Sequence, residues 1–497
     1  MKKIYSSPRV IILLSAALFY FLFFGIGAGI NVLLIAGFSV FLFLLFRKNL
    51  PGKIFYLLLG GMMVSSIAVV FAHSGFSIII FWSCLVLFIG NFAYQQIQHL
   101  HYGLLLSLKS VTRIPATVIG YFPVVIGKRK RNYTSYLRFI FIPILTLMAI
   151  FILYSSSNVL FYQSFEKLFD SLDDFFSTIS FSRLLFFMLG ILIFSLCFVQ
   201  INSSGIIISD STLDLNLTRK KRKSPIRSLN RLLLRKRQIV IVFFLLLNMM
   251  ILLLNYLDIT NIWFGFHWDG GYLKDMVHEG TYLLIVAIII SIAVSVYYLN
   301  SNIVFMKDNH LFNALVIAWL GQNGIMIISV TLRNMIYIEH FALAYKRIFV
   351  YFFLGACFIG LLSIILMIRN KKSVGFLLSV NSISLYLIMI CSACFNWDGV
   401  IARYNFSHYN KSFVHYNFLI GLNDSALPYM DYSDEKLKEI NTVQNNLFSF
   451  ASSVEYTNIN FGDEVKSRKD IFKKRWEQHS WLEWNYPEYR AYQLLFK

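Results

Sequence analysis

Charged residues are scarce in this chain of 497 residues: only 14% are Asp, Glu, Lys or Arg, whereas 57% are hydrophobic. In a water-soluble globular domain about a quarter of the residues are charged and about half are apolar. The 49 Phe and 28 Tyr enlarge the apolar surface further. The composition therefore excludes a fully soluble protein, and we predict a membrane protein whose surface is largely covered by the lipid bilayer.

Cysteine is also scarce, and the chain lacks catalytic motifs, cofactor motifs and internal repeats. All 5 cysteines lie in apolar segments, so a disulfide framework is excluded for the polar tail after residue 395. Cys391 and Cys394 form a C-x-x-C pair, but packing is their favoured role because redox pairs need exposure and a lowered pKa. We expect no cofactor, and the sequence gives no support to an inverted-repeat transporter.

Long apolar runs dominate the sequence instead. A membrane-spanning helix needs about 20 apolar residues, because the hydrocarbon layer is about 30 Å thick and a helix rises about 1.5 Å per residue. The candidate spans are 10–27, 30–46, 54–72, 76–94, 137–157, 182–200, 239–257, 280–299, 312–332, 348–368 and 374–394. The predicted fold class is all-α: a polytopic integral membrane protein of about eleven transmembrane helices with a small, mostly helical extracytoplasmic C-terminal domain.

Lys and Arg are distributed unevenly along the chain. If the N-terminus is inside, the inner segments hold 27 Lys and Arg against three acids, and the outer loops hold six against nine. The tail holds twelve against thirteen. Because cationic loops resist translocation, we predict a bacterial inner-membrane protein with a cytoplasmic N-terminus and an extracytoplasmic C-terminus.

The densest basic run is Arg219, Lys220, Lys221, Arg222 and Lys223. The topology alone accounts for this run, and we favour that interpretation. The alternatives are contact with anionic lipids on the cytoplasmic face or with a cytoplasmic protein partner. We expect no nucleic-acid partner.

Composition divides the chain into four predicted parts. These are an N-terminal membrane region of six spans (1–200), a basic cytoplasmic linker (201–238), a C-terminal membrane region of five spans (239–395) and an extracytoplasmic helical domain (396–497). The stretch 95–136 is apolar but contains Pro115 and Pro123, so we predict an interfacial or re-entrant segment there.

The tail after residue 395 shows the periodicity of helices. Apolar residues recur at helical spacing over 434–451, with Ser433 as a candidate N-cap. Further helices are predicted near 464–479 and over 486–496. About a hundred residues suffice for a small helical core, which we expect to rest on the membrane domain.

Five blocks of the second half carry a family resemblance. They are YLKDMVHEGTYLLI (272–285), AWLGQNGIMIISVTLRNMIYIEHFALAYKRIFVY (318–351), FNWDGVIARYNF (395–406), LNDSALPYM (422–430) and WLEWNYPEYRAYQLL (481–495). Together they resemble an uncharacterised family of bacterial polytopic membrane proteins known only as a domain of unknown function. The likeness covers mainly residues 235–497. One departure is Ala342-Leu343-Ala344, where the family usually has Gly-Leu-Thr. The resemblance implies the architecture and no established reaction.

Asp275, His278 and Glu279 form the clearest mixed polar set of the chain. At spacings i, i+3 and i+4 they share one face of a helix. Such a face could bind a ligand, pass protons or hold a divalent ion. The ordinary interpretation is a polar helix start, where the helix dipole favours acids. We treat the three residues as a hypothetical ligand site and predict no metal site.

Polar residues within the predicted spans are a second set of candidates, because they are costly in lipid. They are Asn248, Gln322, Asn323 and Asn381. Hydrogen bonding between helices is the favoured role, and a substrate path is the alternative.

Three charged residues near the outer ends of the spans extend the hypothetical ligand site. Arg333 has Glu339 within the same predicted outer loop as an available charge partner. Asp398, Arg403 and Asn405 lie where the tail leaves the membrane and could clamp it onto the outer face. The inner face offers charge without a mixture of acid, imidazole and aromatic groups that could recognise a ligand. We therefore predict a functional site on the outer half.

Three functional hypotheses from different classes remain. The first is a sensor, assembly or accessory factor with an outer-face ligand or partner site. The second is a transporter of a small solute or ion, which needs a polar path. The third is an outer-face lipid-linked transferase, which is disfavoured because the first outer loop has no acidic residue. We lean against an enzyme.

Overall fold

The structure is a computed structural model in which the following residues are described: 8–46, 51–121, 181–198, 203–218, 226–264, 271–299, 302–306, 309–448 and 461–497. Within these ranges the side chains of 114–121, 181, 226–233, 271–281 and 302–303 are not described.

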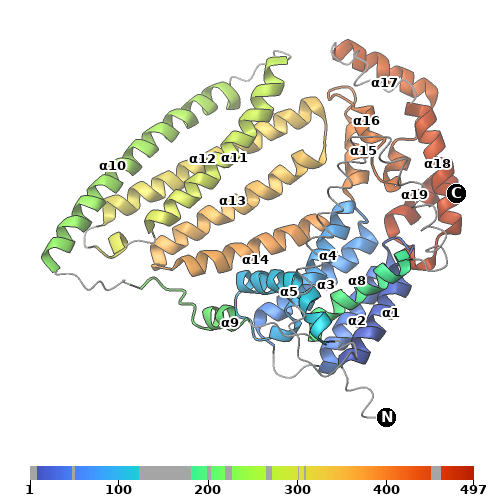
Figure 1. Ribbon diagram of the computed structural model, residues 1–497. Coiled ribbons are helices and arrows are strands. Elements are labelled where there is room, and N and C mark those ends of the chain that lie inside the picture. Colours follow the sequence, from blue (N-terminus) through green and yellow to red (C-terminus); the bar gives the residue numbers. More distant parts are fainter. Residues whose placement is uncertain are drawn as a thin grey trace, which may run out of the picture. The chain divides into compact units, whose positions relative to one another are not determined.

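The described residues form helices and no strands, as the all-α prediction requires (Figure 1). The N-terminal helices are α1 (Pro8–Phe23), α2 (Ile30–Phe46), α3 (Lys53–Phe71), α4 (Gly75–Gly90), α5 (Leu100–Tyr121), α8 (Phe181–Phe198) and α9 (Ser204–Ser211). Then follow α10 (Ile226–Asp258), the π-helical turn η2 (Ile259–Trp263), α11 (Gly271–Leu299), α12 (His310–Phe341), α13 (Tyr345–Asn370) and α14 (Val374–Ala393). The tail holds α15 (Trp397–Ser407), α16 (Tyr416–Leu419), η4 (Asp424–Tyr429), α17 (Asp434–Leu447), α18 (Phe461–Gln478), η6 (Trp481–Glu483) and α19 (Tyr486–Phe496).

Six of the described helices are long and apolar enough to cross a membrane. They are Lys53–Phe71, Leu234–Trp263, Tyr282–Leu299, His310–Phe341, Tyr345–Asn370 and Val374–Ala393. Shorter apolar helices are Pro8–Phe23, Ile30–Phe46, Gly75–Gly90 and Ser182–Phe198. The chain is therefore a multi-pass membrane protein. The predicted fifth span, 137–157, lies outside the described residues, and the count of eleven stays a prediction.

The stretch 95–136 is helical over Leu100–Tyr121, residues 122–136 lie outside the described residues, and the interfacial or re-entrant placement stays a prediction. Helix α5 runs through Pro115 to Tyr121. A proline removes only its own amide hydrogen bond from the helix, and the neighbouring turns can keep the chain helical. The start of α5 is capped by the buried Asp210, whose carboxylate accepts the backbone N–H groups of Gln98 and His99 at 2.9 and 3.0 Å. This carboxylate satisfies amide groups at the positive end of the helix dipole.

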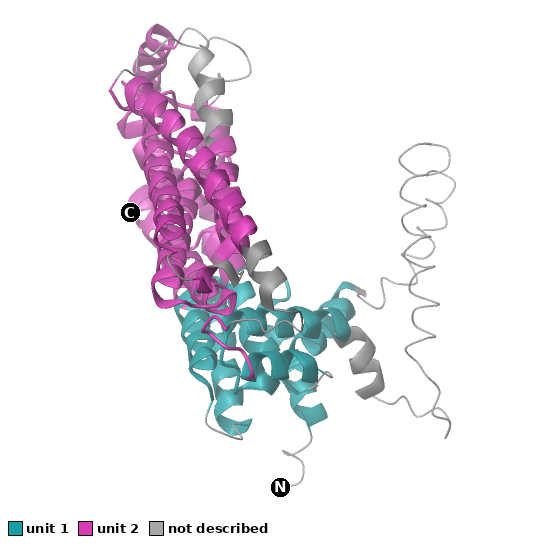
Figure 2. Cartoon of the chain, turned by 90° about the vertical axis from the view of Figure 1, so that its left-hand side faces the viewer, with its two compact units in different colours: residues 1–66, 81–211, 480–483 teal, residues 67–80, 212–479, 484–497 magenta. Residues whose placement is uncertain are grey.

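The chain folds into two compact units, coloured separately in Figure 2. Unit 1 comprises 1–66, 81–211 and 480–483, and unit 2 comprises 67–80, 212–479 and 484–497. The division after residue 211 falls inside the predicted linker. Most of the tail belongs to the same unit as the C-terminal membrane helices, together with the tip of the α3–α4 hairpin.

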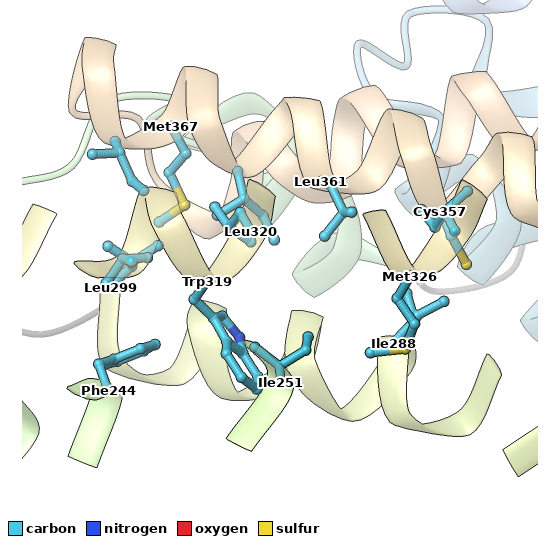
Figure 3. Packing of buried hydrophobic residues seen from close by; sticks show 14 of the residues in the cluster. Phe244, Ile251, Ile288, Leu299, Trp319, Leu320, Met326, Cys357, Leu361 and Met367 are labelled. Carbon is cyan, nitrogen blue, oxygen red and sulfur yellow. The ribbon is translucent and has the colours of Figure 1, made fainter. Parts of the chain in front are cut away.

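Helix α12 packs against α10, α11 and α13, and the core of unit 2 lies among these helices. Figure 3 shows the interleaved side chains, with Phe244 and Ile251 from α10, Trp319 and Leu320 from α12, and Leu361 from α13. Many outward-facing side chains of the same helices are large, apolar and exposed. Such an outer surface is suited to lipid.

Helices α10 and α12 run parallel with a constant register. The buried residues of α10 and η2 recur at intervals of three or four: Val240, Phe244, Asn248, Ile251, Asn255, Asp258 and Ile262. Asn248 Nδ2 donates to the carbonyl of Leu315 at 3.0 Å, and seven residues later Asn255 Nδ2 donates to that of Gln322 at 3.1 Å. A seven-residue repeat is the packing pattern of helices that cross at a shallow angle.

The tail builds a second core around Phe472, Ile440 and Leu427. Helices α17, α18 and α19 lie where the sequence predicts them. Ser433 acts as the N-cap of α17, because its hydroxyl accepts the N–H of Lys436 at 3.3 Å. The tail therefore contains a folded helical core.

Candidate functional site

A buried ion pair joins the C-terminal parts of α10 and α12. Arg333 Nη2 lies 2.5 Å from Asp258 Oδ1, and the two residues are 8% and 5% exposed. The hydroxyl of Ser329 donates to Asp258 Oδ2 at 2.5 Å, and Trp263 Nε1 donates to that hydroxyl at 3.3 Å. Trp263 lies on the π-helical turn η2, which directly follows Asp258. Both oxygens of the carboxylate are thus engaged, which a buried charge requires.

The partner of Arg333 is Asp258 and not Glu339, which the sequence offered as an available charge partner. Arg333 and Glu339 are close in sequence, but Glu339 contributes its backbone carbonyl to another contact, with the hydroxyl of Ser412 at 2.6 Å. Helix packing brings Arg333 to Asp258, which lies 75 positions earlier in the chain. Partners at such separations follow from the register of parallel helices and not from local sequence.

The intramembrane amides mostly make contacts between helices. Gln322 Nε2 donates to Asn248 Oδ1 at 3.0 Å, and Asn381 Nδ2 donates to Ser363 Oγ at 3.0 Å. Asn323 is fully buried and donates to the carbonyl of Trp319 within its own helix. The bonds of Gln322, Asn248 and Asn381 join neighbouring helices, as the favoured interpretation expects, whereas the bond of Asn323 does not.

The tail is seated on the α12–α13 connection by two buried polar side chains of α15. Asn405 accepts the N–H of Leu343 at 2.7 Å and donates to its carbonyl at 3.1 Å. Asp398 accepts the hydroxyl of Tyr345 at 2.5 Å and the N–H of Asn423 at 2.9 Å. Asn405 and Asp398 are 2% and 3% exposed, so few of these bonds compete with water.

The backbone of this connection is left-handed at Ala342, where the family that the sequence resembles usually has glycine. Ala342 has φ of +62°, a left-handed value that glycine adopts without a steric penalty. The family's glycine at this position is therefore the residue that the backbone favours. Here an alanine is held in that conformation by the hydrogen bonds that Asn405 makes to the next residue, Leu343.

A chain of ionisable side chains links the tip of the α3–α4 hairpin to the tail. His73 Nε2 lies 3.7 Å from Glu488, and the same carboxylate oxygen lies 2.8 Å from Arg475. Arg475 also reaches Asp424 at 3.2 Å. Burial lowers the pKa of His73 below its ordinary value, although Glu488 opposes the shift. The neutral imidazole is therefore favoured, and Asn423 Nδ2 fixes the same turn by donating to the His73 carbonyl at 3.3 Å.

A pocket of about 260 Å³ lies among α15, η4 and α19 of the tail. Its lining is mainly aromatic and apolar, with two cationic side chains, Arg403 and Arg490. Both arginines are exposed, and within the described chain neither has an ion pair or a hydrogen bond through its guanidinium. Phe71, the last residue of the span α3, forms part of the wall.

The structure distributes the predicted site residues over different surroundings. Arg333 belongs to the ion pair between helices, Asp398 to the seat of the tail, and Arg403 to the pocket. Asp275, His278 and Glu279 lie on α11, so their spacing is helical as predicted. Their side chains lie outside the described residues, as does the whole of the basic run 219–223. The ligand-binding roles of all six outer residues stay predictions.

Sequence reasoning missed Asp258 and Arg490, whereas Asn405 was identified with Asp398 and Arg403 at the start of the tail. Asp258 was outside the predicted span by one residue, yet its spacing from Asn248 and Asn255 continues the buried stripe of α10. That stripe was a usable signal. Nothing in the sequence pairs Asn405 with Leu343 or Arg490 with Arg403, because both relations arise from the packing of the tail.

Comparison with known proteins gives a family and no activity. A protein family described as a domain of unknown function, DUF4153, matches residues 10–432. The match includes the N-terminal half, and it ends before the block 481–495 that also carries the resemblance. No curated protein and no solved structure matches the chain.

Proposed function

This chain belongs to the DUF4153 family of unknown function, and on that premise we propose that it is a sensor or accessory factor with a recognition site on the outer face of the bacterial inner membrane. The tail receives a ligand or partner there, and the C-terminal membrane helices carry the resulting change toward the cytoplasmic linker. The observation that carries the proposal is the polar seat of the tail on the α12–α13 connection.

The proposal needs a connected path through the membrane, and the contacts supply one. Asn405 and Asp398 hold the tail on the residues between α12 and α13. Helix α12 is bonded along its length to α10 through Gln322, Ser329 and Arg333. Helix α10 is continuous for 33 residues and begins next to the basic run. A shift of the tail on the α12–α13 connection can thus bias one rigid element after another.

Contacts among the loops support the grouping of segments that the N-in, C-out topology predicts. On the predicted outer side, the turn at His73 and the connection at Leu343 both bond to the tail. On the predicted inner side, Ser373 donates to the carbonyl of Asp214 at 2.6 Å. In each case the two bonded segments are expected on the same side of the membrane.

We expect alkaline phosphatase to be active when it is fused after Lys497, because the enzyme matures only after export. A reporter that works only in the cytoplasm should be active when it is inserted at Ser224 in the basic linker. Activity is measured in whole cells and normalised to the amount of fusion protein. If the C-terminal fusion is abundant but its phosphatase is inactive, the topology is contradicted. The predicted number of spans is then wrong by an odd number.

Transport of a small solute or ion is the second candidate, and one observation favours it. The buried polar atoms of α10 and α12 that have no hydrogen-bond partner among the described residues include Asn255 Oδ1, Trp319 Nε1, Gln322 Oε1 and Asn323 Oδ1. Buried polar groups normally find a partner, so these atoms are suited to contact with water or a polar solute. The same helices also pair closely through their amides, which favours a structural seam.

The test of the proposed function is a labelling experiment on the inner linker. Ser224→Cys is introduced, and its modification by a maleimide is timed in inside-out vesicles, with the parent chain as the background for the native cysteines. Releasing the tail with Asn405→Leu should change the labelling rate by about twofold or more, the size of typical coupling energies. The exposed Asn410→Leu is the matched control. An unchanged rate with a released tail contradicts the coupling.

A further inference from the structure

We propose that the tail pocket binds the phosphate group of an anionic lipid from the outer leaflet, with Arg403 and Arg490 as the phosphate-binding cations. The assignment rests on the proposed function, because it names the ligand class of the recognition domain. Four features of the pocket support it: its position at the ends of spans, its cations, the engagement of nearby acids and its apolar walls.

The pocket lies where two membrane spans end. Phe71 is the last residue of one candidate span, and Asn396 follows another, Val374–Ala393, by three positions. Both residues line the pocket. The ends of spans lie at the boundary between hydrocarbon and water, where aromatic side chains accumulate and lipid headgroups reside. A ligand that enters here therefore meets the headgroup layer before bulk water.

The two cations approach from different helices. Arg403 lies on α15 one turn after Val400, and Arg490 lies on α19 one turn after Tyr486, and all four line the same pocket. Guanidinium groups bind phosphate through paired N–H donors, more specifically than lysine does. Two such groups on one pocket are suited to a phosphate ester.

Nearby acids do not neutralise these arginines. Asp398 accepts bonds from Tyr345 and Asn423, Asp424 pairs with Arg468 and Arg475, and Glu488 pairs with Arg475 and His73. All three carboxylates are therefore engaged by other groups. The positive charge of the pocket remains available to a ligand.

The rest of the wall is suited to hydrocarbon. Phe71, Val400 and Leu494 are 58%, 43% and 59% exposed, and each lines the pocket. Phe71 and Tyr486 face each other with ring centroids 6.0 Å apart. A soluble phosphate would leave these surfaces in water, whereas the glycerol backbone and chains of a lipid would cover them. The combination favours a lipid over a free anion.

Binding is tested with the full chain purified in a neutral detergent. The probes are short-chain phosphatidylglycerol, phosphatidylcholine of the same chain length, and glycerol phosphate. We expect phosphatidylglycerol to bind about tenfold or more tightly than the other two, because charge-assisted and apolar contacts both contribute. Equal binding of phosphatidylcholine contradicts recognition of an anionic headgroup, and equal binding of glycerol phosphate contradicts the assignment to a lipid.

Two variants separate the phosphate contacts from the apolar contacts. Arg403→Gln with Arg490→Gln should weaken phosphatidylglycerol binding about tenfold or more. Lys438→Gln with Lys474→Gln removes the same charge from exposed positions elsewhere in the tail and should leave binding unchanged. Leu494→Asn should weaken binding of the lipid and leave that of glycerol phosphate unchanged.

Folding is checked for every variant by protease resistance and by elution as a single species. Full binding by the folded Arg403→Gln/Arg490→Gln variant overturns the site. This failure is distinguishable from failure of the proposed function: if Asn405→Leu still alters labelling at Ser224→Cys, the coupling stands and only the ligand assignment is wrong. Loss of coupling with intact lipid binding means the reverse: the ligand assignment stands and the proposed coupling is wrong.

Discussion

Replacing Arg333 with Met should lower the free energy of unfolding by about 3–5 kcal/mol, because the change leaves the Asp258 carboxylate buried without its counter-charge. Asp258 is 5% exposed, so water cannot take the place of the guanidinium without rearranging the helices. The measurement is unfolding of the purified chain in mixed micelles with increasing denaturing detergent. Lys346→Met, at an exposed position nearby, should change stability by only about 0.5 kcal/mol.

A double variant distinguishes the ion pair from the packing of the Arg333 stem. Asp258→Asn combined with Arg333→Met removes both charges and retains an oxygen that can accept the Ser329 hydroxyl. We expect it to recover most of the stability that Arg333→Met loses, because replacement of a whole buried pair is often nearly neutral. If the double variant is no more stable than Arg333→Met alone, the charge pair contributes little and the loss comes from packing.

The seam between α10 and α12 shows how far the sequence could predict the structure. Apolar runs place the helices correctly, because lipid demands apolar faces and internal backbone hydrogen bonds. The polar residues Asn248 and Gln322 were identified for the same reason: they are exceptions in such runs. Their partners were not predicted, since two helices 67 positions apart in register leave no local signal. Asp258 and Arg333 are the clearest case.

For the candidate site, the sequence predicted some of the residues but not which of them lie together. Arg403 and Asp398 were identified as neighbours of the membrane exit, and both lie on α15. Their roles differ because the two side chains lie on different faces of this short helix. Asp398 is buried and bonded to Tyr345 and Asn423, whereas Arg403 is exposed and lines the pocket. A spacing of five residues on a helix already predicts different faces. Arg490, the second cation, comes from the distant end of the tail, and only tertiary packing brings it to Arg403.

The transport and sensor hypotheses differ in what they require of the same helices. A transporter needs α10 and α12 to separate, so that a solute can pass between their polar atoms. A sensor needs the two helices to move together, and the repeated bonds at Asn248, Asn255 and Asp258 favour joint motion. The unpartnered atoms are then suited to a few bound waters within a rigid seam. Displacement of the tail distinguishes the two hypotheses, because only the sensor hypothesis requires it to affect α10 and α12.

Replacing Asn405 with Leu should release the tail from the α12–α13 connection. Asn405 is 2% exposed and makes two bonds to Leu343, one to its N–H and one to its carbonyl. A leucine of similar size fills the space but leaves both backbone groups without partners. Each unsatisfied buried group costs about 1–3 kcal/mol, so the loss of two bonds should make local opening about thirtyfold or more as frequent.

Limited proteolysis from the outer side measures this opening. In the unaltered chain the described helices α17, α18 and α19 should resist cleavage, because their core includes Leu437, Val465 and Phe472. In Asn405→Leu the cleavage rate of the tail should rise by the factor given above, while the membrane helices stay intact. Asn410→Leu adds the same side chain at an exposed position in the same segment and should leave the rate unchanged. A tail that is cut equally fast in all three chains is not held by Asn405, and the seat proposed as the start of the signalling path must then lie elsewhere.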